Sequence, residues 1–507
     1  MKYVCSVKTQ YENLSKEELI TAYTSLQTAH AFLQSELSQI KFELGQLRRQ
    51  VYSSKRERFI ADVNPGQLSL LDIEPKQPEE TQKVTVPSYE RRKNSKKPSR
   101  NSFPEHLQRI VTKIYPPGYD ESTDAEIIGW EKTELLNCVP AQFYVEQILR
   151  AKIKTKEGEI ITAELPDRVI AKGIFGTNLI ASILVDKYVD HLPLHRQCER
   201  INRNGINIAE STIGDVPRQV APKVDLLYDE LVQQTIQSGY LNVDETPTPV
   251  LDPKKKGKTH RGYFWTYHSP EKKLVLFDYR QGRGREGPDE MLKDFKGFLQ
   301  TDGYSVYDAY ENREAVTLVG CMAHARRYFE QALNSDRERA EHVMKLIQKL
   351  YTTERKMREA ESPMSDQEIV ALRMEESKPV LDDLQKWLEE HLNIVTPKSP
   401  LGKAITYMYS RWHKLTVYID HAHLNIDNNL VENAIRPTVL GRKNYMFAGN
   451  HEAAQRNAMY YSLMGSCKLN GINPYEWLID VLERLPDTKS SQLYTLLPNN
   501  WQPRQKN

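Results

Sequence analysis

The sequence predicts an α/β protein in which a mixed β-sheet carries packed helices and follows a long coiled-coil helix and a helical region. Three observations support this fold class. Apolar residues repeat every seven positions between 19 and 51. Three consecutive strand patterns, and then strands alternating with helices, occupy residues 239–333. A further stretch at 335–420 has apolar residues at helical spacing and predicts a helical insertion.

The composition is that of a soluble globular protein, with 27% charged and 39% hydrophobic residues among 507. The longest mostly apolar stretch, 179–185, is too short to span a bilayer, and the first residues lack the apolar core of a signal peptide. These features predict a cytoplasmic protein with no membrane partner. The five cysteines lie far apart without a CxxC pair, which argues against a disulfide scaffold or a four-cysteine zinc site.

Residues 1–60 predict a leucine-zipper-like coiled coil. Its two sets of heptad positions are Leu19, Leu26, Leu33, Ile40 and Leu47, and, offset by four, Tyr23, His30, Leu37, Leu44 and Val51. Such a seam is buried only against another helix, and the chain has no second heptad run of comparable length. Self-association into a homo-oligomer is therefore at least as good an interpretation as a helix folded back on its own protein.

Residues 61–104 are rich in Pro, Gln, Lys and Ser and predict a basic linker, which a small mixed segment at 105–165 follows. Residues 91–100 of the linker hold six basic residues and no acid. Far outside the linker, 254–261 holds five basic residues besides His260. Such clusters can neutralise DNA phosphates, but each one alone is better explained as a solvated linker or hairpin tip. The net charge of +2 gives no argument about nucleic acid.

Residues 166–235 predict a helical region. Within it, 192–220 has the pattern of a helix, a Gly-containing turn and a second helix capped by Ser211 or Thr212. This pattern is compatible with a helix-turn-helix that binds DNA through its second helix, although plain helical hairpins are commoner. Two His and one Cys at 191–198 could suggest a metal site, but without a fourth ligand we interpret them as core residues.

Residues 236–450 predict the catalytic α/β domain. Its helix signals lie at 287–295 and 320–333, and its strand patterns lie at 239–250, 262–269, 272–280, 297–301 and 315–319. The helical insertion at about 335–420 is interpreted as a DNA-contacting or dimerising arm. A C-terminal helical segment occupies 451–507.

Three carboxylates are placed where this sheet would bring them together. Asp244 ends the apolar run of the first strand, and Asp302 ends that of the fourth. Side chains at strand ends can converge at one edge of an α/β sheet, where ligands bind. Glu432 is the single acidic residue between 428 and 451, and it supplies the third carboxylate from a helix. With 68 acidic residues in the chain, the strand context carries this prediction more than the triple itself.

Carboxylate oxygens are the hard ligands that Mg²⁺ prefers, and three of them would hold two Mg²⁺ ions, for which Mn²⁺ would substitute. Two such ions clamp a phosphodiester, so the three carboxylates predict catalysis of phosphodiester chemistry on DNA. Three basic residues follow Glu432 and are expected to meet the DNA backbone beside the metal site, namely Arg436, Arg442 and Lys443.

Several long strings of the chain, matching in order, carry a resemblance. They are NVDETPTPVLDP (242–253), FLQTDGYSVYD (298–308), GCMAHARRYF (320–329), NNLVENAIRPTVLGRKNYMFAGN (428–450) and KLNGINPYEWLIDVLERL (468–485), with KYVDHLPLHRQCERI (187–201), STIGD (211–215) and VYSSKRERF (51–59) upstream. With these strings the chain resembles the insertion-sequence-66 family of bacterial DDE transposases over nearly its whole length.

The resemblance implies a ribonuclease-H-like catalytic domain that uses Mg²⁺ to cleave DNA and transfer strands. It also implies binding to the element's terminal inverted repeats and to target DNA, with accessory transposition proteins as further candidate partners. Asp244, Asp302 and Glu432 match the family's catalytic triad, which also binds the metal. Cys321 and His324 match a CxxH element, and His324 is expected to contact DNA or order the metal site. The basic residues expected to contact DNA with it are Arg326 and Arg327.

One segment departs from the family pattern. Many members carry a small cysteine-rich zinc module where this chain has 105–165, and here that segment contains only Cys138. The module is therefore degenerate or replaced by a metal-free fold, and no zinc is expected. Two other functions remain open: a ribonuclease-H-like nuclease that cleaves without joining, and a non-catalytic DNA-binding regulator.

Overall fold

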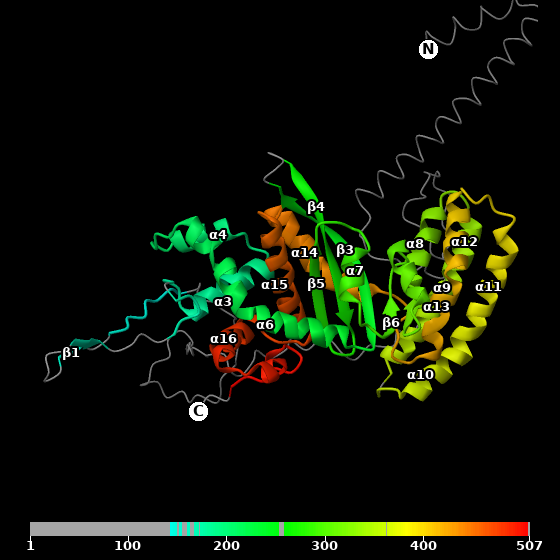
Figure 1. The fold of residues 1–507 in the computed structure, drawn as a ribbon. Helices are drawn as coiled ribbons and strands as arrows, with labels where there is room; N and C mark the ends of the chain where they lie inside the picture. Colours follow the sequence, from blue (N-terminus) through cyan, green and yellow to red (C-terminus); the bar gives the residue numbers. More distant parts are fainter. Residues whose placement is uncertain are drawn as a thin grey trace, which may run out of the picture. The chain divides into compact units, whose positions relative to one another are not determined.

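A computed structural model describes residues 142–149, 152–154, 160–162, 167–171, 173–252, 258–360 and 362–504. The chain divides into two compact units, with the boundary between Asp167 and Arg168 in the described part. The predicted heptads at 1–60, the linker at 61–104 and most of 105–165 lie outside the described residues. The larger unit is shown as a ribbon in Figure 1 and holds the sheet and its helices.

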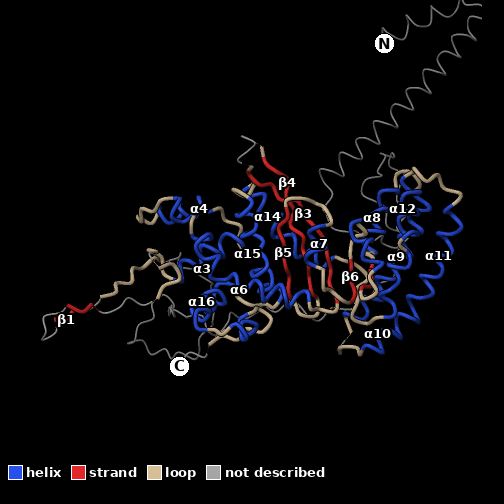
Figure 2. Tube along the Cα trace, viewed as in Figure 1, coloured by secondary structure: helices blue, strands red, loops and turns tan. Residues whose placement is uncertain are grey.

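The sheet has five strands in the spatial order β5-β4-β3-β6-β7. They are β3 (Tyr240–Leu251), β4 (Thr259–Ser269), β5 (Leu274–Arg280), β6 (Gly297–Gln300) and β7 (Val316–Val319). Strands β3, β4 and β5 are antiparallel neighbours, whereas β6 and β7 run parallel to β3. Helix α7 (Glu286–Met291) precedes β6, and a 3₁₀ helix (Ser305–Asn312) precedes β7. The predicted mixed sheet is confirmed, and Figure 2 shows its strands together.

Strand β3 extends beyond its parallel pairing with β6. Strand β3 pairs with β6 only from Tyr240 to Asn242, but its antiparallel pairing with β4 continues to Leu251. Residues 243–251 therefore extend with β4 beyond the parallel part of the sheet as an arm. Strand β5 continues along β4 as far as Tyr263, opposite Pro247, so only 248–251 and 259–262 are two-stranded. The predicted first strand, 239–250, is confirmed to within one residue at each end, and Asp244 ends its apolar run while lying inside the strand.

Helix α15 (His451–Leu469) covers the free edge of β5. The hydroxyl of Ser462 accepts the backbone N–H of Phe277, and the hydroxyl of Ser466 accepts that of Val275. The unpaired N–H groups of an edge strand need such partners or water. Other helices on this side of the sheet are α3 (Thr177–Tyr188), α4 (Leu194–Asn202), α6 (Val216–Ile236) and α16 (Pro474–Arg484).

The helical region at 177–236 differs from the prediction at its second helix. Helix α5 (Glu210–Gly214) begins after Ala209, which has no side-chain cap, and Asp215 separates it from α6. The expected caps Ser211 and Thr212 lie inside α5, because the chain turns helical before it reaches them. Of the two His and one Cys at 191–198, Cys198 is buried and its Sγ donates to the carbonyl oxygen of Ile208, as expected of a core residue. The core interpretation was wrong for His195, which is exposed on α4, and His191 is half-buried.

The stretch after β7 is helical, as predicted. Its elements are α8 (Met322–Ala332), α9 (Arg337–Arg358), α10 (Asp366–Leu372), a π-helical turn (Arg373–Ser377), α11 (Lys378–Leu392), α12 (Pro400–Ser410), α13 (Trp412–Thr416) and a 3₁₀ turn (Val417–Asp420). Their buried side chains form one core that also includes Tyr240 of β3 and Val319 of β7. This shared core fixes the helical insertion against the sheet.

The smaller unit contains, in its described part, strands β1 (Lys152–Lys154) and β2 (Ile160–Thr162), which pair antiparallel. None of the helices in the described ranges has the length and apolar character needed to cross a membrane.

Candidate active site

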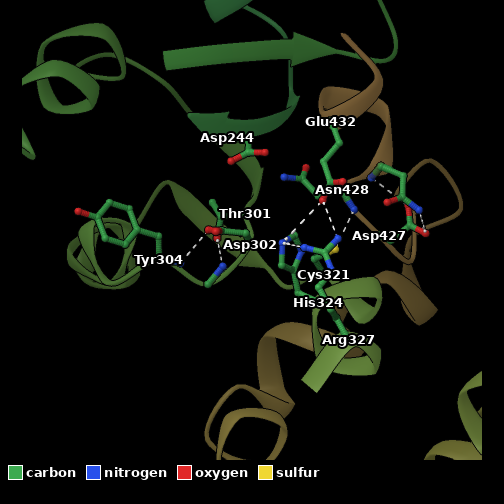
Figure 3. Close-up of polar contacts among 12 residues, drawn as sticks. Asp244, Thr301, Asp302, Tyr304, Cys321, His324, Arg327, Asp427, Asn428 and Glu432 are labelled. Atoms are coloured by element: carbon green, nitrogen blue, oxygen red, sulfur yellow. Dashed lines mark hydrogen bonds and ion pairs between the residues drawn. The ribbon is translucent and has the colours of Figure 1, made fainter. Parts of the chain in front are cut away.

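The two aspartates occupy equivalent places on neighbouring parallel strands. The parallel pairing of β3 and β6 ends at the pair Asn242 and Gln300, and Asp244 and Asp302 each lie two residues further along. Both carboxylates therefore lie at the carboxyl edge of the parallel strands, where α/β sheets bind ligands. Figure 3 shows them around a common space with Glu432, which lies in the first turn of α14 (Asn429–Tyr445).

Asn428, directly before α14, fixes that helix to the sheet. Its side-chain amide donates to the carbonyl oxygen of Val243 at 2.9 Å, one residue before Asp244. Its backbone N–H donates to the Sγ of Cys321 at 3.2 Å. Asn428 is fully buried, so these bonds are shielded from water. They place Glu432, one helical turn later, on the same side as Asp244.

A buried polar network lies beneath the aspartates. Gln300 accepts from the side-chain amide of Asn242 at 2.7 Å and from the hydroxyl of Tyr240. Its own amide donates to the carbonyl oxygens of Gly320 at 3.0 Å and Asn425 at 2.8 Å. One glutamine thus joins β3, β6, the end of β7 and the loop that leads to α14. Such satisfied networks hold a single arrangement of the surrounding backbone.

The turn at Asp302 is held by its own carboxylate and by α12. The Oδ1 of Asp302 accepts the N–H of Tyr304 at 2.8 Å, and Gly303 has a positive φ of 85°, which L side chains rarely adopt. From α12, the hydroxyl of Tyr407 donates to the carbonyl oxygen of Asp302 at 2.6 Å. The next residue after α12, Arg411, donates to the carbonyl oxygen of Gly303 at 3.0 Å.

Electrostatics at the site favour binding of a cation. The pKa of Asp244 lies well above its ordinary value because the carboxyl is buried, and the charges of Asp302 and Glu245 raise it further. Burial also raises the pKa of Glu245, although an ion pair with Arg283 opposes this shift. Asp244 has no ion pair with any basic side chain in the described part of the chain. A buried carboxylate without a counter-charge is destabilising unless a cation joins it.

Glu432 contacts basic groups. Its Oε1 lies 3.5 Å from the guanidinium of Arg327 and 3.7 Å from the imidazole Nε2 of His324 (Figure 3). Burial lowers the pKa of His324, and the nearby Arg327 charge lowers it further, while Asp302 and Glu432 act in the opposite direction. Within the described ranges, no three His, Cys, Asp or Glu side chains are grouped closely enough to hold a metal ion. Carboxylate oxygens are the ligands that a hard divalent cation prefers. For Glu432 to bind such a cation together with the two aspartates, its carboxylate would have to leave Arg327 and His324.

The basic residues predicted to contact DNA divide into three groups. Arg327, Arg436 and Lys443 are partly or fully exposed, and Arg442 is half-buried against the arm, where it donates to the carbonyl oxygen of Pro247. Arg326 is only 2% exposed, so its prediction as a DNA contact was wrong for this conformation. It lies on the face of α8 that packs into the insertion core, together with neighbours such as Phe329.

Sequence reasoning missed the residues that position the carboxylates. Asn428, Gln300 and Tyr407 make the bonds described above, and none of them belongs to a motif with a recognised chemical role. Only the Asp-Gly pair at 302–303 gave a usable signal, because this dipeptide favours a turn with a positive φ.

Comparisons with known proteins agree with one another. The family model described as "Transposase IS66 family" matches residues 172–456, that described as "IS66 C-terminal element" matches 462–499, and that described as "Transposase C of IS166 homeodomain" matches 39–112. Two similar proteins come from Sinorhizobium fredii. "Uncharacterized protein y4jD" is 32% identical over 420 residues, covering 79% of this chain and 81% of its own length. "Uncharacterized protein y4qI" is 28% identical over 478 residues, covering 90% and 87%.

Proposed function

The chain belongs to the IS66 family of transposases, and we propose that it cleaves DNA at the terminal inverted repeats of its element and joins the ends to target DNA. Membership in a DDE transposase family implies polynucleotidyl transferase activity and, in general, the use of divalent metal ions. The catalytic residues we assign are Asp244, Asp302 and Glu432. The catalytic domain we assign is 236–450, with an insertion at about 335–420, a DNA-binding region at 166–235 and a C-terminal segment at 451–507.

One observation carries this assignment. Asp244 and Asp302 lie two residues beyond the same parallel pair of strands, and Asn428 ties the helix of Glu432 to the backbone beside Asp244. Three acids from β3, β6 and α14 thereby reach one space around a buried carboxylate that has no basic partner in the described ranges. In chain order the strands lie as 3-2-1-4-5, with the second antiparallel, and this supports a ribonuclease-H-like domain.

The chemistry follows from these groups. Bound divalent cations supply activation of the attacking water or 3′ hydroxyl and neutralise charge at the leaving oxygen. Asp244 and Asp302 would hold the cations from the rigid sheet, and Glu432 would complete the ligand set from α14. Arg436, Arg442 and Lys443 are on the same helix and would bind phosphates that flank the reacting one, with Arg327 beside Glu432. The heptads at 1–60 would pair two chains, so that two DNA ends are cut in one complex.

The test replaces Glu432 with Gln, which keeps the size of the side chain and removes the charge that a hard cation needs. We expect cleavage and strand transfer of inverted-repeat DNA in Mg²⁺ to fall by several orders of magnitude, while a gel shift shows unchanged DNA binding. The matched control is Glu390→Gln, at an exposed position on α11, which should retain full activity.

Three outcomes decide between the functions. Full cleavage by the Glu432→Gln variant would remove this residue from the catalytic set. Cleavage by the wild-type protein without joining of the 3′ end to target DNA would identify a nuclease. Binding of inverted repeats without any Mg²⁺-dependent nicking would identify a DNA-binding regulator.

A further inference from the structure

The chain makes an unusual turn where α14 ends. Met446 has φ 57° and ψ −48°, a conformation that residues other than glycine rarely adopt. Across it, the N–H of Phe447 donates to the carbonyl oxygen of Tyr445 at 2.6 Å, which closes a three-residue turn. Turns of this hand are rare and strained, and strained residues persist only where the surrounding structure holds them.

Both sides of the turn are held. The N–H of Met446 donates to the carbonyl oxygen of Arg442 at 2.8 Å within the last turn of α14. Two residues later, Ala448 pairs with the arm: its N–H donates to Pro249 at 2.9 Å, and its carbonyl oxygen accepts the N–H of Leu251 at 2.8 Å. This pairing imposes the turn and directs an apolar side chain outward, since Met446 is 65% exposed. Nothing in the described fold buries that side chain.

Positive charge surrounds the turn. The pKa of Arg442 is lowered, first by its partial burial and then by the nearby charge of Arg261 on β4. An anion between or beside these two guanidinium groups would offset their mutual repulsion. Within the described residues, neither forms an ion pair with a carboxylate, and Lys443 adds an exposed positive charge beside them. Arg442, Met446 and Phe447 are among the residues that line one shallow pocket.

The turn lies close enough to Glu432 along α14 for one DNA duplex to contact both. Arg442 and Met446 follow Glu432 by ten and fourteen residues on one helix, which corresponds to roughly 15 and 21 Å at the rise of an α-helix. At ~3.4 Å per nucleotide along one strand, this is about four to six base pairs of duplex. A DNA molecule that runs along α14 with its reacting phosphate at Glu432 would therefore reach Met446 after about six base pairs, slightly more than half a helical turn.

We propose that Met446 is a wedge that enters a base step of the bound duplex, while Arg442 and Arg261 hold the neighbouring phosphate. Apolar side chains enter DNA in this way when they partly unstack a step, and basic neighbours stabilise the bent backbone. The strained turn keeps the wedge extended before DNA arrives, so no ordering is needed on binding. This inference rests on the proposed function, because it takes the DNA of the same active site as its ligand.

The test measures binding of the full chain to two duplexes of one arbitrary sequence, by fluorescence anisotropy without Mg²⁺. One duplex is fully paired, and the other carries a single abasic site, where unstacking is already complete. A wedge should favour the abasic duplex by about tenfold, or ~1.4 kcal/mol, because part of the unstacking cost is already met at the abasic site. Met446→Gly should abolish the preference without disturbing the turn, since glycine adopts this φ readily. Met446→Leu should retain it.

Two further variants separate the wedge from general DNA binding. Met374→Ala removes another exposed methionine, in the insertion, and should leave the preference intact. Arg261→Gln should weaken binding to both duplexes and reduce the salt dependence by about one phosphate contact. Equal binding of both duplexes by the wild-type protein, or an unchanged preference in Met446→Gly, would overturn the wedge and leave the proposed function standing. Failure to bind either duplex would also overturn the wedge, and the cleavage assay on inverted-repeat DNA tests the proposed function separately.

Discussion

The negative charge of Asp244 is unfavourable in the folded protein when no cation is bound. It is half-buried on β3 beside two further acids, Glu245 and Asp302, and its pKa is raised mainly by loss of hydration and then by the charge of Asp302. A raised pKa means that the folded protein binds the proton more tightly than the unfolded chain does. The contribution of this group to stability is therefore full at acidic pH, below its ordinary value, and is lost as the pH rises through the raised value.

We expect Asp244→Asn to raise the melting temperature of the metal-free protein by a few degrees at neutral pH, while abolishing cleavage. The amide keeps the shape of the side chain and removes a charge that has no partner within the described part of the chain. Thermal unfolding in a chelating buffer across a pH series checks this. The gain should shrink toward acidic pH, where the wild-type carboxyl is protonated. A variant less stable than wild type at every pH would contradict the argument.

The sequence places the two aspartates nearly correctly, because an apolar run followed by an acid is a local signal that strand pairing preserves. It could not reveal that Asn428 and Gln300 hold the backbone around these carboxylates, since their bonding partners lie far away in the chain. Nor could it show the burial of Arg326, because the face of α8 that becomes core is chosen by helices that follow later in the chain. Contacts between distant segments decide both features.

At the scale of elements, the helical insertion supports the segment that carries the third carboxylate of the candidate site. Tyr351 of α9 donates from its hydroxyl to Asp427 at 2.8 Å, just before α14. Arg373 is 2% exposed, forms an ion pair with Glu354, and donates to three carbonyl oxygens of the chain between 418 and 424. An arm for DNA or for dimerisation was the expected role. These bonds give the insertion a second role, because they fix the segment that carries Glu432.

Tyr407 offers the sharpest test of that role. Tyr407→Phe removes only the hydroxyl that donates to the carbonyl oxygen of Asp302, and we expect a loss of about 1 kcal/mol in unfolding free energy. Because the Asp302 turn loosens, cleavage should fall by about tenfold while DNA affinity is unchanged. The control is Tyr409→Phe, two residues along the same helix at a 39% exposed position, which should match wild type. Equal cleavage by both variants would show that the hydrogen bond from Tyr407 does not position Asp302 for cleavage.

At the scale of the whole molecule, the described part of the chain contributes one set of three acids, whereas transposition requires cutting at two DNA ends. The segment 39–112 matches a further family model, in agreement with a leucine-zipper region in this family. The structure describes none of the residues before 142, so the heptads remain a prediction from the sequence. Their spacing predicts a seam for a second chain, which would bring two active sites into one assembly.

Substitutions in the full chain test this assembly. Leu26→Asp with Leu33→Asp places charges at two core positions of the predicted seam, and burial of those charges would be strongly unfavourable. We expect light scattering to show a smaller species and strand transfer of paired ends to be lost with it. Thr28→Asp with Ser35→Asp adds the same charges at the outer positions of the same heptads, and should leave the mass and the activity unchanged. An unaltered mass in the Leu variants would locate the oligomer contact elsewhere in the chain.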